Sequence, residues 1–358
     1  MRTIVFTGGG SAGHVTPNLA IITRLQQLGW DIRYIGSAAG IEKDIMAHEG
    51  IPFYPISSGK LRRYVDVKNI KDPFKVAKGV YDSYKILRSL KPAIVFSKGG
   101  FVSVPVVLGS KMKRIPTIIH ESDMTPGLAN KLAIPFAAKV CVTFPETMKH
   151  IKGHKAVLTG LPIRPAILQG NAMKGLQLCD FHSQKPVVMV MGGSLGSQAM
   201  NKALRDNLET WLADFQIVHI CGKGNLASAL LDVRGYKQFE FVSDELPDIM
   251  AMADLVVSRA GSTSIYEFLA LEKPMLLIPL SRQASRGDQI LNAGSFQRSG
   301  YAAVLDEADL TGESLILAVR SLYENRSSFK AAMATRNSMD AVESIISLIE
   351  AHSLPKLV

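Results

Sequence analysis

The chain has 358 residues, 47% of them hydrophobic and 20% charged, a composition typical of a globular protein with two domains. No apolar run approaches the roughly 18 residues that cross a bilayer, and a strand begins near residue 3, so we expect neither a membrane span nor a signal peptide. Three widely spaced cysteines, Cys141, Cys179 and Cys221, exclude a disulfide framework and indicate reduced, cytosolic thiols.

The net charge of +10 is concentrated in the first half of the chain. Residues 1–160 contain 23 Lys and Arg against 10 Asp and Glu, whereas residues 161–358 contain 18 against 21, so the two parts carry +13 and −3. The first part is therefore expected to meet an anionic partner that the second does not. The distribution of its lysines favours an anionic membrane surface, and we expect no nucleic acid partner.

Strand-like and helical patterns alternate along the first half, which indicates an α/β domain with a parallel sheet. The predicted strands cover residues 3–7, 31–36, 52–56, 93–97, 116–120, 139–143 and 155–159. The predicted helices between them are clearest at 16–28, 40–49, 73–90, 103–113 and 127–137.

A glycine-rich turn follows the first predicted strand, where Gly8-Gly9-Gly10-Ser11-Ala12-Gly13-His14 leads into a helix. Glycines let backbone amides approach a ligand, and the helix N-terminus favours negative charge. The spacing matches the dinucleotide fingerprint. However, the second predicted strand has its only acid, Asp31, at its start, so a nicotinamide cofactor is not expected.

His14 is the candidate general base. It follows the last glycine of the turn, where the positive end of a helix dipole keeps an imidazole neutral and able to accept a proton from an attacking hydroxyl. The alternative is a histidine that only hydrogen-bonds a neighbouring backbone group. Glu121 and Asp123, which lie beside His120, could share or replace the role of base.

A basic, amphipathic segment lies between residues 60 and 91, where ten lysines and arginines stand against three aspartates. One interpretation is a helix that packs its apolar stripe into the core and leaves its lysines in water. The other is a helix that lies on anionic lipid headgroups, and both interpretations can hold for different faces. The stripe consists of Phe74, Ala77, Val80, Tyr81, Tyr84 and Leu87.

The second half repeats the alternation after Leu161-Pro162-Ile163-Arg164-Pro165 and the polar stretch 168–185, which we interpret as a hinge and interdomain connection. We expect a first domain at 1–162, a second at 163–339, and a helix within 340–358 that packs back onto the first. The predicted strands lie near 186–191, 215–221, 236–242, 254–258, 274–279 and 301–305. The predicted helices lie near 197–213, 224–233, 245–252, 263–271, 285–299 and within 310–352.

Two strand ends in the second half lead into small residues. Gly192-Gly193-Ser194 offers amides and a hydroxyl to a pyrophosphate, and Arg259-Ala260-Gly261-Ser262-Thr263-Ser264 adds donors at the start of a helix. Glu267 falls on the first turns of that helix, where its carboxylate can bind both hydroxyls of a ribose. The alternative for Glu267 is a surface acid that complements the helix dipole.

The chain contains no Asp-x-Asp pair and no His, Cys and Asp cluster with metal spacing. We therefore expect no metal and no cofactor. A leaving diphosphate would instead be stabilised by backbone amides and by Arg164.

Several motifs occur in order along nearly the whole chain: Gly-Gly-Gly-x-x-Gly-His at 8–14, Ser97-Lys98-Gly99-Gly100-Phe101-Val102-Ser103-Val104-Pro105, His120-Glu121-Ser122-Asp123 with Pro126-Gly127-Leu128-Ala129-Asn130, Gly192-Gly193-Ser194, Arg259-Ala260-Gly261-Ser262 with Glu267, and Asp288-Gln289 with Asn292-Ala293. Together they resemble the MurG family of bacterial glycosyltransferases in its Gram-positive form. The resemblance implies a GT-B fold, in which two Rossmann-like α/β domains with parallel sheets face a cleft.

The resemblance also implies an activity: inverting transfer of GlcNAc from UDP-GlcNAc to the C4 hydroxyl of MurNAc-pentapeptide-pyrophosphoryl-undecaprenol (lipid I), giving lipid II for peptidoglycan. It puts the lipid acceptor on the first domain and the sugar nucleotide mainly on the second. It further implies a peripheral protein on the cytoplasmic face of the cell membrane, with proteins of a cell-wall or division complex as candidate partners.

By the same resemblance, the acceptor is expected to meet Lys98, Gly99, Gly100 and Asn130. Val242 would meet the uracil through its backbone, Glu267 the ribose and Gln289 the GlcNAc hydroxyls. Asp123 and Asp288 depart from the Gram-negative pattern, which has Asn and Gln there. The full set expected to bind UDP-GlcNAc is Ser11, Ala12, Gly13, Asp123, Arg164, Gly193, Ser194, Val242, Ser262, Thr263, Ser264, Glu267 and Gln289.

Two other functions stay open on the sequence. A UDP-GlcNAc 2-epimerase can use the same two-domain architecture, but the basic, aromatic-bearing helix argues for a lipid acceptor that an epimerase does not need. A non-catalytic UDP-sugar-binding scaffold on the membrane would have no need of His14, Arg164 and Glu267 together.

Overall fold

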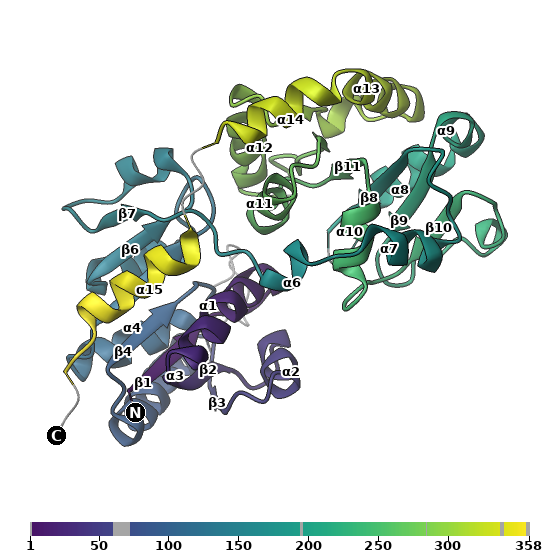
Figure 1. Cartoon of the computed structure of the whole chain (residues 1–358). Coiled ribbons are helices and arrows are strands. Elements are labelled where there is room, and N and C mark those ends of the chain that lie inside the picture. Colours follow the sequence, from purple (N-terminus) through teal and green to yellow (C-terminus); the bar gives the residue numbers. More distant parts are fainter. Residues whose placement is uncertain (1, 60–71, 194–195, 284, 337–339, 356–358) are drawn as a thin grey trace. The chain divides into compact units, whose positions relative to one another are not determined.

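The computed structural model describes residues 2–59, 72–193, 196–283, 285–336 and 340–355. The chain divides into two compact units, Met1–Arg164 with Met339–Val358, and Pro165–Ser338. Each unit is built on one parallel sheet that has helices on both faces (Figure 1).

The sheet of the first unit has seven parallel strands in the spatial order β3-β2-β1-β4-β5-β6-β7. The strands are β1 (Thr3–Thr7), β2 (Asp31–Ser37), β3 (Phe53–Ile56), β4 (Ile94–Ser97), β5 (Thr117–Glu121), β6 (Lys139–Val142) and β7 (Ala156–Leu158). The helices are α1 (Thr16–Gln27), α2 (Ile41–His48), α3 (Asp72–Leu90), α4 (Ser103–Met112), α5 (Leu128–Ala133) and α15 (Ala341–His352), with 3-10 turns η1 (Ala12–His14), η3 (Ile134–Phe136) and η4 (Pro145–His150).

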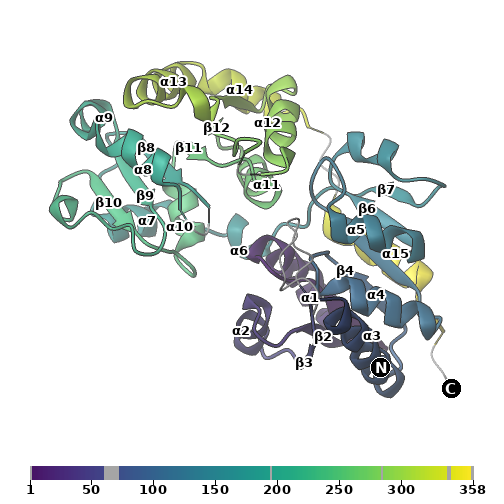
Figure 2. The ribbon, with the colours of Figure 1, turned by 180° about the vertical axis from the view of Figure 1, so that it is seen from behind.

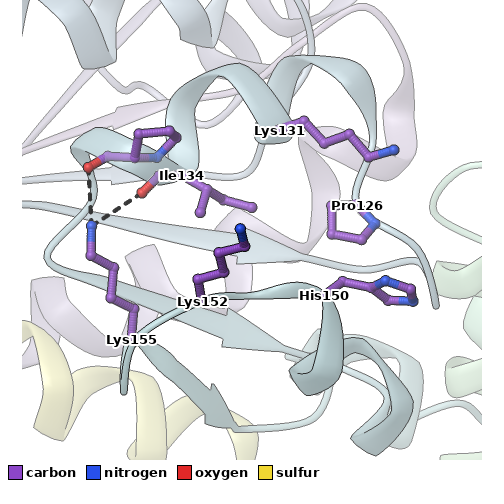
Figure 3. A pocket seen from close by; sticks show the side chains of 7 residues that line it. Pro126, Lys131, Ile134, His150, Lys152 and Lys155 are labelled. Carbon is purple, nitrogen blue, oxygen red and sulfur yellow. Dashed lines mark hydrogen bonds between the residues drawn. The ribbon is translucent and has the colours of Figure 1, made fainter.

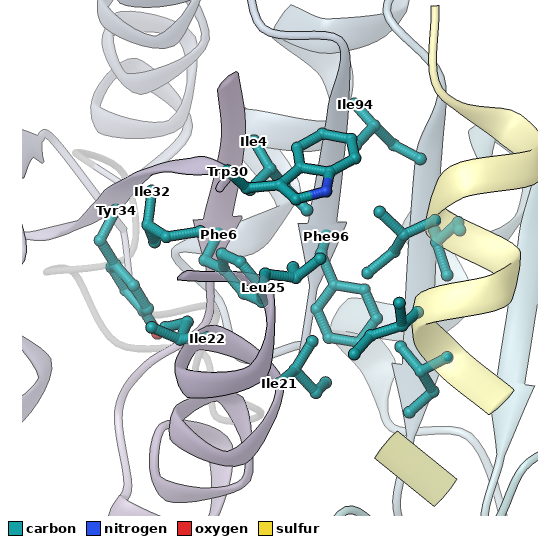
Figure 4. Close-up of a cluster of buried hydrophobic side chains, with 14 of the residues drawn as sticks. Ile4, Phe6, Ile21, Ile22, Leu25, Trp30, Ile32, Tyr34, Ile94 and Phe96 are labelled. Atoms are coloured by element: carbon teal, nitrogen blue, oxygen red, sulfur yellow. The ribbon is translucent and has the colours of Figure 1, made fainter. Parts of the chain in front are cut away.

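Strand β1 shows why this sheet needs helices on both faces. Ile4 and Phe6 are fully buried on one face, and Val5 is fully buried on the other. The first face carries the core in Figure 4, where Leu25 of α1 and Trp30 pack over the strands. The second face packs against α3 and α4, and Figure 2 shows α3, α4 and α5 along it.

Helix α15 belongs to the first unit although it ends the chain. Ile345, Ile346 and Ile349 are buried in the same core as α1. At the surface, Nε of Arg24 on α1 lies 2.6 Å from Oε1 of Glu343 on α15. The apolar stripe of α15 is therefore what returns the C-terminal segment to the first sheet.

The sheet of the second unit has six parallel strands in the order β10-β9-β8-β11-β12-β13. The strands are β8 (Val187–Met191), β9 (Gln216–Ile220), β10 (Tyr236–Phe239), β11 (Leu255–Ser258), β12 (Met275–Leu277) and β13 (Ala302–Val304). The helices are α6 (Pro165–Leu168), α7 (Ala172–Cys179), α8 (Gln198–Arg205), α9 (Leu208–Asp214), α10 (Leu246–Met252), α11 (Ser262–Ala270), α12 (Asp288–Arg298), α13 (Gly312–Glu324) and α14 (Arg326–Ala334), with 3-10 turns η5 (Ser228–Leu230) and η6 (Glu307–Asp309).

The sequence suggested that the polar stretch 168–185 is a connection between the domains. In the structure this stretch also contains a helix, α7. Leu176 and Cys179 are buried, and a Cβ on Gly175 would lie 2.4 Å from the carbonyl oxygen of Asp248 at α10. Asn171 caps the helix by accepting from the amides of Met173 and Lys174. The missing side chain at residue 175 allows this close helix packing, which charge and polarity alone do not reveal.

The helix predicted near 224–233 is also wrong, since only the short turn η5 forms there. Gly222 and Gly224 have positive φ angles of 91° and 75°, which end regular structure. The amide side chain of Gln238 on β10 bonds both the amide and the carbonyl of Ala227, each at 3.1 Å. These side-chain bonds satisfy the backbone in place of a helix.

Candidate active site

In each sheet the strand order reverses beside the first strand of the unit, between β1 and β4 in the first and between β8 and β11 in the second. Ligands of open parallel sheets bind outside the carboxyl ends of the strands at such a reversal. The glycine turns follow β1 and β8, and the Lys98-Gly99-Gly100 and Arg259-Ala260-Gly261 segments follow β4 and β11. The predicted motifs of each unit therefore meet at one edge of its sheet.

The first glycine turn is held in place by a buried carboxylate. Glu42 of α2 is fully buried and accepts from the amide of Ser37 at 2.9 Å and from the amide of Gly10 at 3.3 Å. A Cβ on Gly9 would lie 2.4 Å from that carboxylate. Glu42 was not among the predicted site residues, because the acid expected from the glycine motif lies inside the second strand, whereas Glu42 follows that strand and bonds the turn.

His14 ends the turn η1, immediately before α1. Its Nδ1 lies 2.9 Å from Oγ of Ser11, and its backbone amide donates to the carbonyl of Ser11 at 3.1 Å. Ala12 and Gly13 form the same turn. The ring is half-buried, and its orientation is set by the turn that carries the other predicted substrate contacts.

Glu121, which the sequence left open as an alternative base, is bonded within its own loop. Its carboxylate is 4% exposed and accepts from the amides of Asp123 and Gly127, each at 3.0 Å, and from Nδ2 of Asn130 at 2.8 Å. Burial raises the pKa of Glu121, against these donors, which favour the charged form. This geometry is that of a carboxylate that organises the loop after β5. Asp123, the other acidic candidate, is half-buried.

Lys98 is buried, with 1% of its surface exposed, and its Nζ lies 3.0 Å from Nδ1 of His120 and also contacts Oγ of Ser122. The expected direct contact between Lys98 and an acceptor is therefore not supported. Gly99 and Gly100 have φ angles of 96° and 83°, and Asn130 packs against Gly99. A Cβ on Gly100 would lie 2.2 Å from the carbonyl oxygen of Gly9, so this segment needs glycine to touch the first turn.

At the edge of the second sheet, the turn after β8 approaches the start of α8. Gly193 has a φ angle of 90°, and a Cβ on Gly192 would lie 2.3 Å from the amide nitrogen of Ser197. Ser197 caps α8 by accepting from the amide of Met200. Ser194 lies outside the described residues, so its predicted contact stays a prediction.

Arg259 ties the strand ends of the second unit together, a role that the sequence analysis did not assign. Its guanidinium donates to Oγ of Ser197 at 2.8 Å and to the carbonyl oxygen of Ile278 at 3.0 Å, and pairs with Glu307. Glu307 also accepts from the amide of Ser281 at 3.2 Å. The signal was present, since arginine is rare in a buried strand end and its fork can bond several partners at once.

Helix α11 begins directly after Arg259-Ala260-Gly261 and carries Ser262, Thr263, Ser264 and Glu267. Ser262 is buried, and Thr263 and Ser264 are half-buried. Glu267 is only 6% exposed, which excludes the alternative of a surface acid that merely complements the helix dipole. It lies on the second turn of α11, the helix that follows the carboxyl end of β11.

The remaining predicted contacts are spread over three loops. Val242 is buried after β10, and Arg164 is the half-buried last residue of the first unit. Gln289, at the start of α12, accepts from the amide of Leu280 at 3.1 Å. The carboxylate of its neighbour Asp288 lies 3.4 Å from the guanidinium of Arg286. These two side chains therefore shape the loop after β12.

Helix α3 presents an exposed basic and aromatic face, although residues 60–71 lie outside the described part of the chain. Leu87 is fully buried, but Phe74 and Tyr81 are 76% and 57% exposed, so the predicted stripe is only partly a core stripe. Nζ of Lys85 lies 4.5 Å from the ring centre of Tyr81. Lys75 and Lys78 are exposed on the same helix.

A second basic region surrounds a hollow of about 440 Å³ beside α5, shown in Figure 3. Lys155 is fixed there, since its Nζ donates to the carbonyl oxygens of Pro135 at 3.0 Å and Ile134 at 3.5 Å. The lining contains four basic side chains and no acid: it consists of Pro126, Lys131, Ile134, Pro135, His150, Lys152 and Lys155. This hollow is suited to an anionic group.

Within the described residues, no helix is long and apolar enough to cross a membrane. Over the same part of the chain, no group of three or more His, Cys, Asp and Glu side chains is placed to hold a metal ion.

The comparisons with known proteins identify the family. The glycosyltransferase family 28 N-terminal domain matches residues 4–142, and the C-terminal domain of the same family matches residues 187–349. A Bacillus cereus protein named UDP-N-acetylglucosamine–N-acetylmuramyl-(pentapeptide) pyrophosphoryl-undecaprenol N-acetylglucosamine transferase 2 is 59% identical over 97% of this chain and 98% of its own length.

Solved structures share the fold. MurG of Acinetobacter baumannii has a TM-score of 0.77 at 24% identity, over 98% of this chain and all of that one. A putative UDP-N-acetylglucosamine 2-epimerase of Listeria monocytogenes has a TM-score of 0.71 at 12% identity, over 98% and 97%. Transferases and epimerases therefore share this fold. The high sequence identity, in contrast, is to the Bacillus cereus transferase, at 59%, and not to the epimerase, at 12%. The chain has the GT-B fold and belongs to glycosyltransferase family 28, in its MurG group.

Proposed function

We propose that this protein transfers GlcNAc from UDP-GlcNAc to the C4 hydroxyl of MurNAc in undecaprenyl-pyrophosphoryl-MurNAc-pentapeptide, with inversion at the anomeric carbon. The observation that carries the proposal is the 59% identity to a transferase with this donor and acceptor in its name, over 97% of the chain. The 2-epimerase alternative has only the fold in its favour, at 12% identity. The scaffold alternative has no observation in its favour.

The second unit is the proposed donor site. Its two strand ends offer what UDP requires: a glycine turn and the N-terminus of α11 for the diphosphate, and the buried carboxylate of Glu267 for the ribose hydroxyls. Val242 would meet the uracil through its backbone, and Gln289 would meet the GlcNAc hydroxyls. Arg259 holds these strand ends together, because its guanidinium bonds Ser197 and Ile278 at once.

The first unit is the proposed acceptor site, and His14 is its proposed base. A sugar hydroxyl becomes nucleophilic as its proton is removed, and a well-placed base contributes about 10²–10⁴ in rate. Glu121 is occupied by three N–H donors, which leaves His14 and Asp123 of the three candidates. The bond of Ser11 to Nδ1 orients the imidazole, so Nε2 is the nitrogen proposed to accept the hydroxyl proton.

The chemical step leaves UDP with a new negative charge on its diphosphate. Backbone amides at Gly193 and at the start of α11, together with the guanidinium of Arg164, are the proposed stabilising groups. We infer that they act without a divalent cation, since the chain has no Asp-x-Asp pair.

We further propose that the first unit binds the cytoplasmic leaflet peripherally. The exposed Phe74, Tyr81 and lysines of α3 offer both an apolar and a basic contact to anionic headgroups. The basic hollow at α5 extends this surface, since α3, α4 and α5 lie along the same face of the first sheet (Figure 2).

The decisive experiment incubates the protein with labelled UDP-GlcNAc and a short-chain lipid I analogue. We expect labelled disaccharide-linked lipid and free UDP. Labelled ManNAc would instead identify an epimerase, and binding of UDP-GlcNAc without any product would identify a scaffold.

A further inference from the structure

Lys98 is a buried ammonium that joins two neighbouring strand ends of the first sheet. It follows β4, and both side chains that its Nζ contacts, His120 and Ser122, lie at the end of β5. With 1% of its surface exposed, Lys98 cannot reach a substrate. Nothing in the proposed reaction uses it, although a buried charge is costly unless it is bonded.

The hydrogen bonds fix the protonation of His120. Its Nε2 lies 2.9 Å from the carbonyl oxygen of Gly160, which can only accept, so Nε2 carries the proton. Burial and the nearby charge of Lys98 hold the pKa of His120 well below its usual range, so the ring is neutral. Nδ1 is therefore the acceptor, and Lys98 is its donor at 3.0 Å.

The same ammonium orients the turn after β5. Ser122 directly follows Glu121, whose carboxylate accepts from the amides of Asp123 and Gly127 and from Nδ2 of Asn130. Burial lowers the pKa of Lys98 to about 8, opposed by the carboxylates of Glu121 and Asp123, so the side chain is mainly charged at neutral pH. A charged donor makes the stronger hydrogen bonds.

We propose that Lys98 is a positioning residue for the acceptor: it fixes the tautomer of His120 and the orientation of Ser122, and so steadies the loop after β5, in which Asn130 bonds Glu121 and packs against Gly99. The proposal rests on the proposed function, because it assigns the acceptor to this edge of the first sheet. It also explains a motif position that the sequence associated with the acceptor and that the structure buries.

The first test is spectroscopic and needs no substrate. In protein labelled with ¹⁵N-histidine, His120 is expected to show a protonated Nε2 and a hydrogen-bonded, unprotonated Nδ1, assigned by the signal missing from His120→Gln. Lys98→Met removes the donor at similar volume, so the Nδ1 resonance is expected to move to the position of a nitrogen without a donor. Lys111→Met, an exposed lysine on α4, is the matched control. An unchanged Nδ1 resonance in Lys98→Met overturns the inference.

The second test separates positioning from folding. Lys98→Met is expected to raise the KM of the lipid I analogue about tenfold while the affinity for UDP stays at the parent value. Lys98→Arg, which restores a donor, is expected to recover part of the loss. Ser122→Ala keeps the bond to His120 and is expected to give a smaller acceptor effect with an unchanged Nδ1 resonance. Unchanged acceptor kinetics in both Lys98→Met and Ser122→Ala contradict the proposal. A parent protein that transfers no GlcNAc contradicts the proposed function instead.

Discussion

The two sheet edges solve different electrostatic problems. At the first edge, Glu42, Lys98 and Glu121 are buried and bonded to amides and neutral side chains of the same unit. At the second edge, Arg259 is a buried cation that bonds three separate loops. The first arrangement organises the loops at the edge where the acceptor is proposed to bind. The second supports the glycine turn and the start of α11, where a diphosphate is proposed to bind. The two proposed edges thus share one topology and differ in their buried charges.

The largest expected effect at the edge of the first sheet is that of His14. We expect His14→Ala to lower turnover by at least about 100-fold while UDP-GlcNAc affinity stays near normal, because the base is needed only in the chemical step. Steady-state kinetics with separate titration of UDP measures both. His48→Ala, an exposed histidine on α2, is the control. Near-normal turnover would show that the base lies elsewhere, and a loss confined to donor affinity would show that His14 positions the donor.

The basic face of α3 belongs to the acceptor unit alone, so charge reversal should affect membrane binding and not donor binding. Each lysine near an anionic surface contributes about 1 kcal/mol, so replacing Lys75, Lys78 and Lys85 by Glu is expected to weaken vesicle binding by at least about 100-fold. Added salt should act in the same direction. The control replaces the exposed Lys43, Lys174 and Lys330 by Glu. Equal losses in both triple variants would leave only a nonspecific charge effect.

Glu267 tests the donor edge. A charge-assisted hydrogen bond contributes about 1.5–3 kcal/mol, so Glu267→Ala is expected to raise the donor KM roughly 10- to 100-fold with the folded state retained. Glu313→Ala removes an exposed acid from the first turn of α13 and is the matched control for the helix dipole. Calorimetric titration with UDP checks the affinity. An unchanged donor constant would remove Glu267 from the ribose.

The buried charge of Lys98 should appear in the pH dependence of stability. Burial lowers the pKa of Lys98 from its ordinary value of 10.5 to about 8 in the folded protein, so between these values the unfolded chain binds more protons and stability rises with pH. Relative to Lys98→Met, the parent is expected to gain up to about 3 kcal/mol in its free energy of unfolding from pH 8 to 10.5. Denaturant titrations of both proteins across this window measure the difference. A constant difference would mean that Lys98 is not desolvated.

The smallest expected effect is that of a chelator. Because amides and Arg164 are the proposed stabilising groups for the leaving diphosphate, saturating EDTA is expected to leave turnover within about twofold of its initial value. Complete loss, restored by magnesium or manganese, would require a cation at the donor edge.

Much of the fold followed from local pattern. Short, largely apolar runs followed directly by glycine, such as Thr3–Thr7 and Val187–Met191, predicted buried parallel strands and the turns after them. The GT-B fold and the family were likewise accessible, because several motifs occur in order. The prediction of a helix near 224–233 was wrong, because the side chain of Gln238 on the following strand bonds the amide and carbonyl groups of Ala227.

At the site, the sequence by itself determined which residue types gather at the strand ends, since the chain direction of a parallel sheet brings those ends to one edge. Only the tertiary structure decided which of them face inward. Lys98 and Glu121, which the sequence offered as candidate site residues, are buried and bond other residues of the first unit. Glu42 is buried too, and it bonds the glycine turn more than thirty residues earlier in the chain. The physical reason is that a buried polar group must find its partner across the fold, and such pairings leave no periodic signal in the sequence.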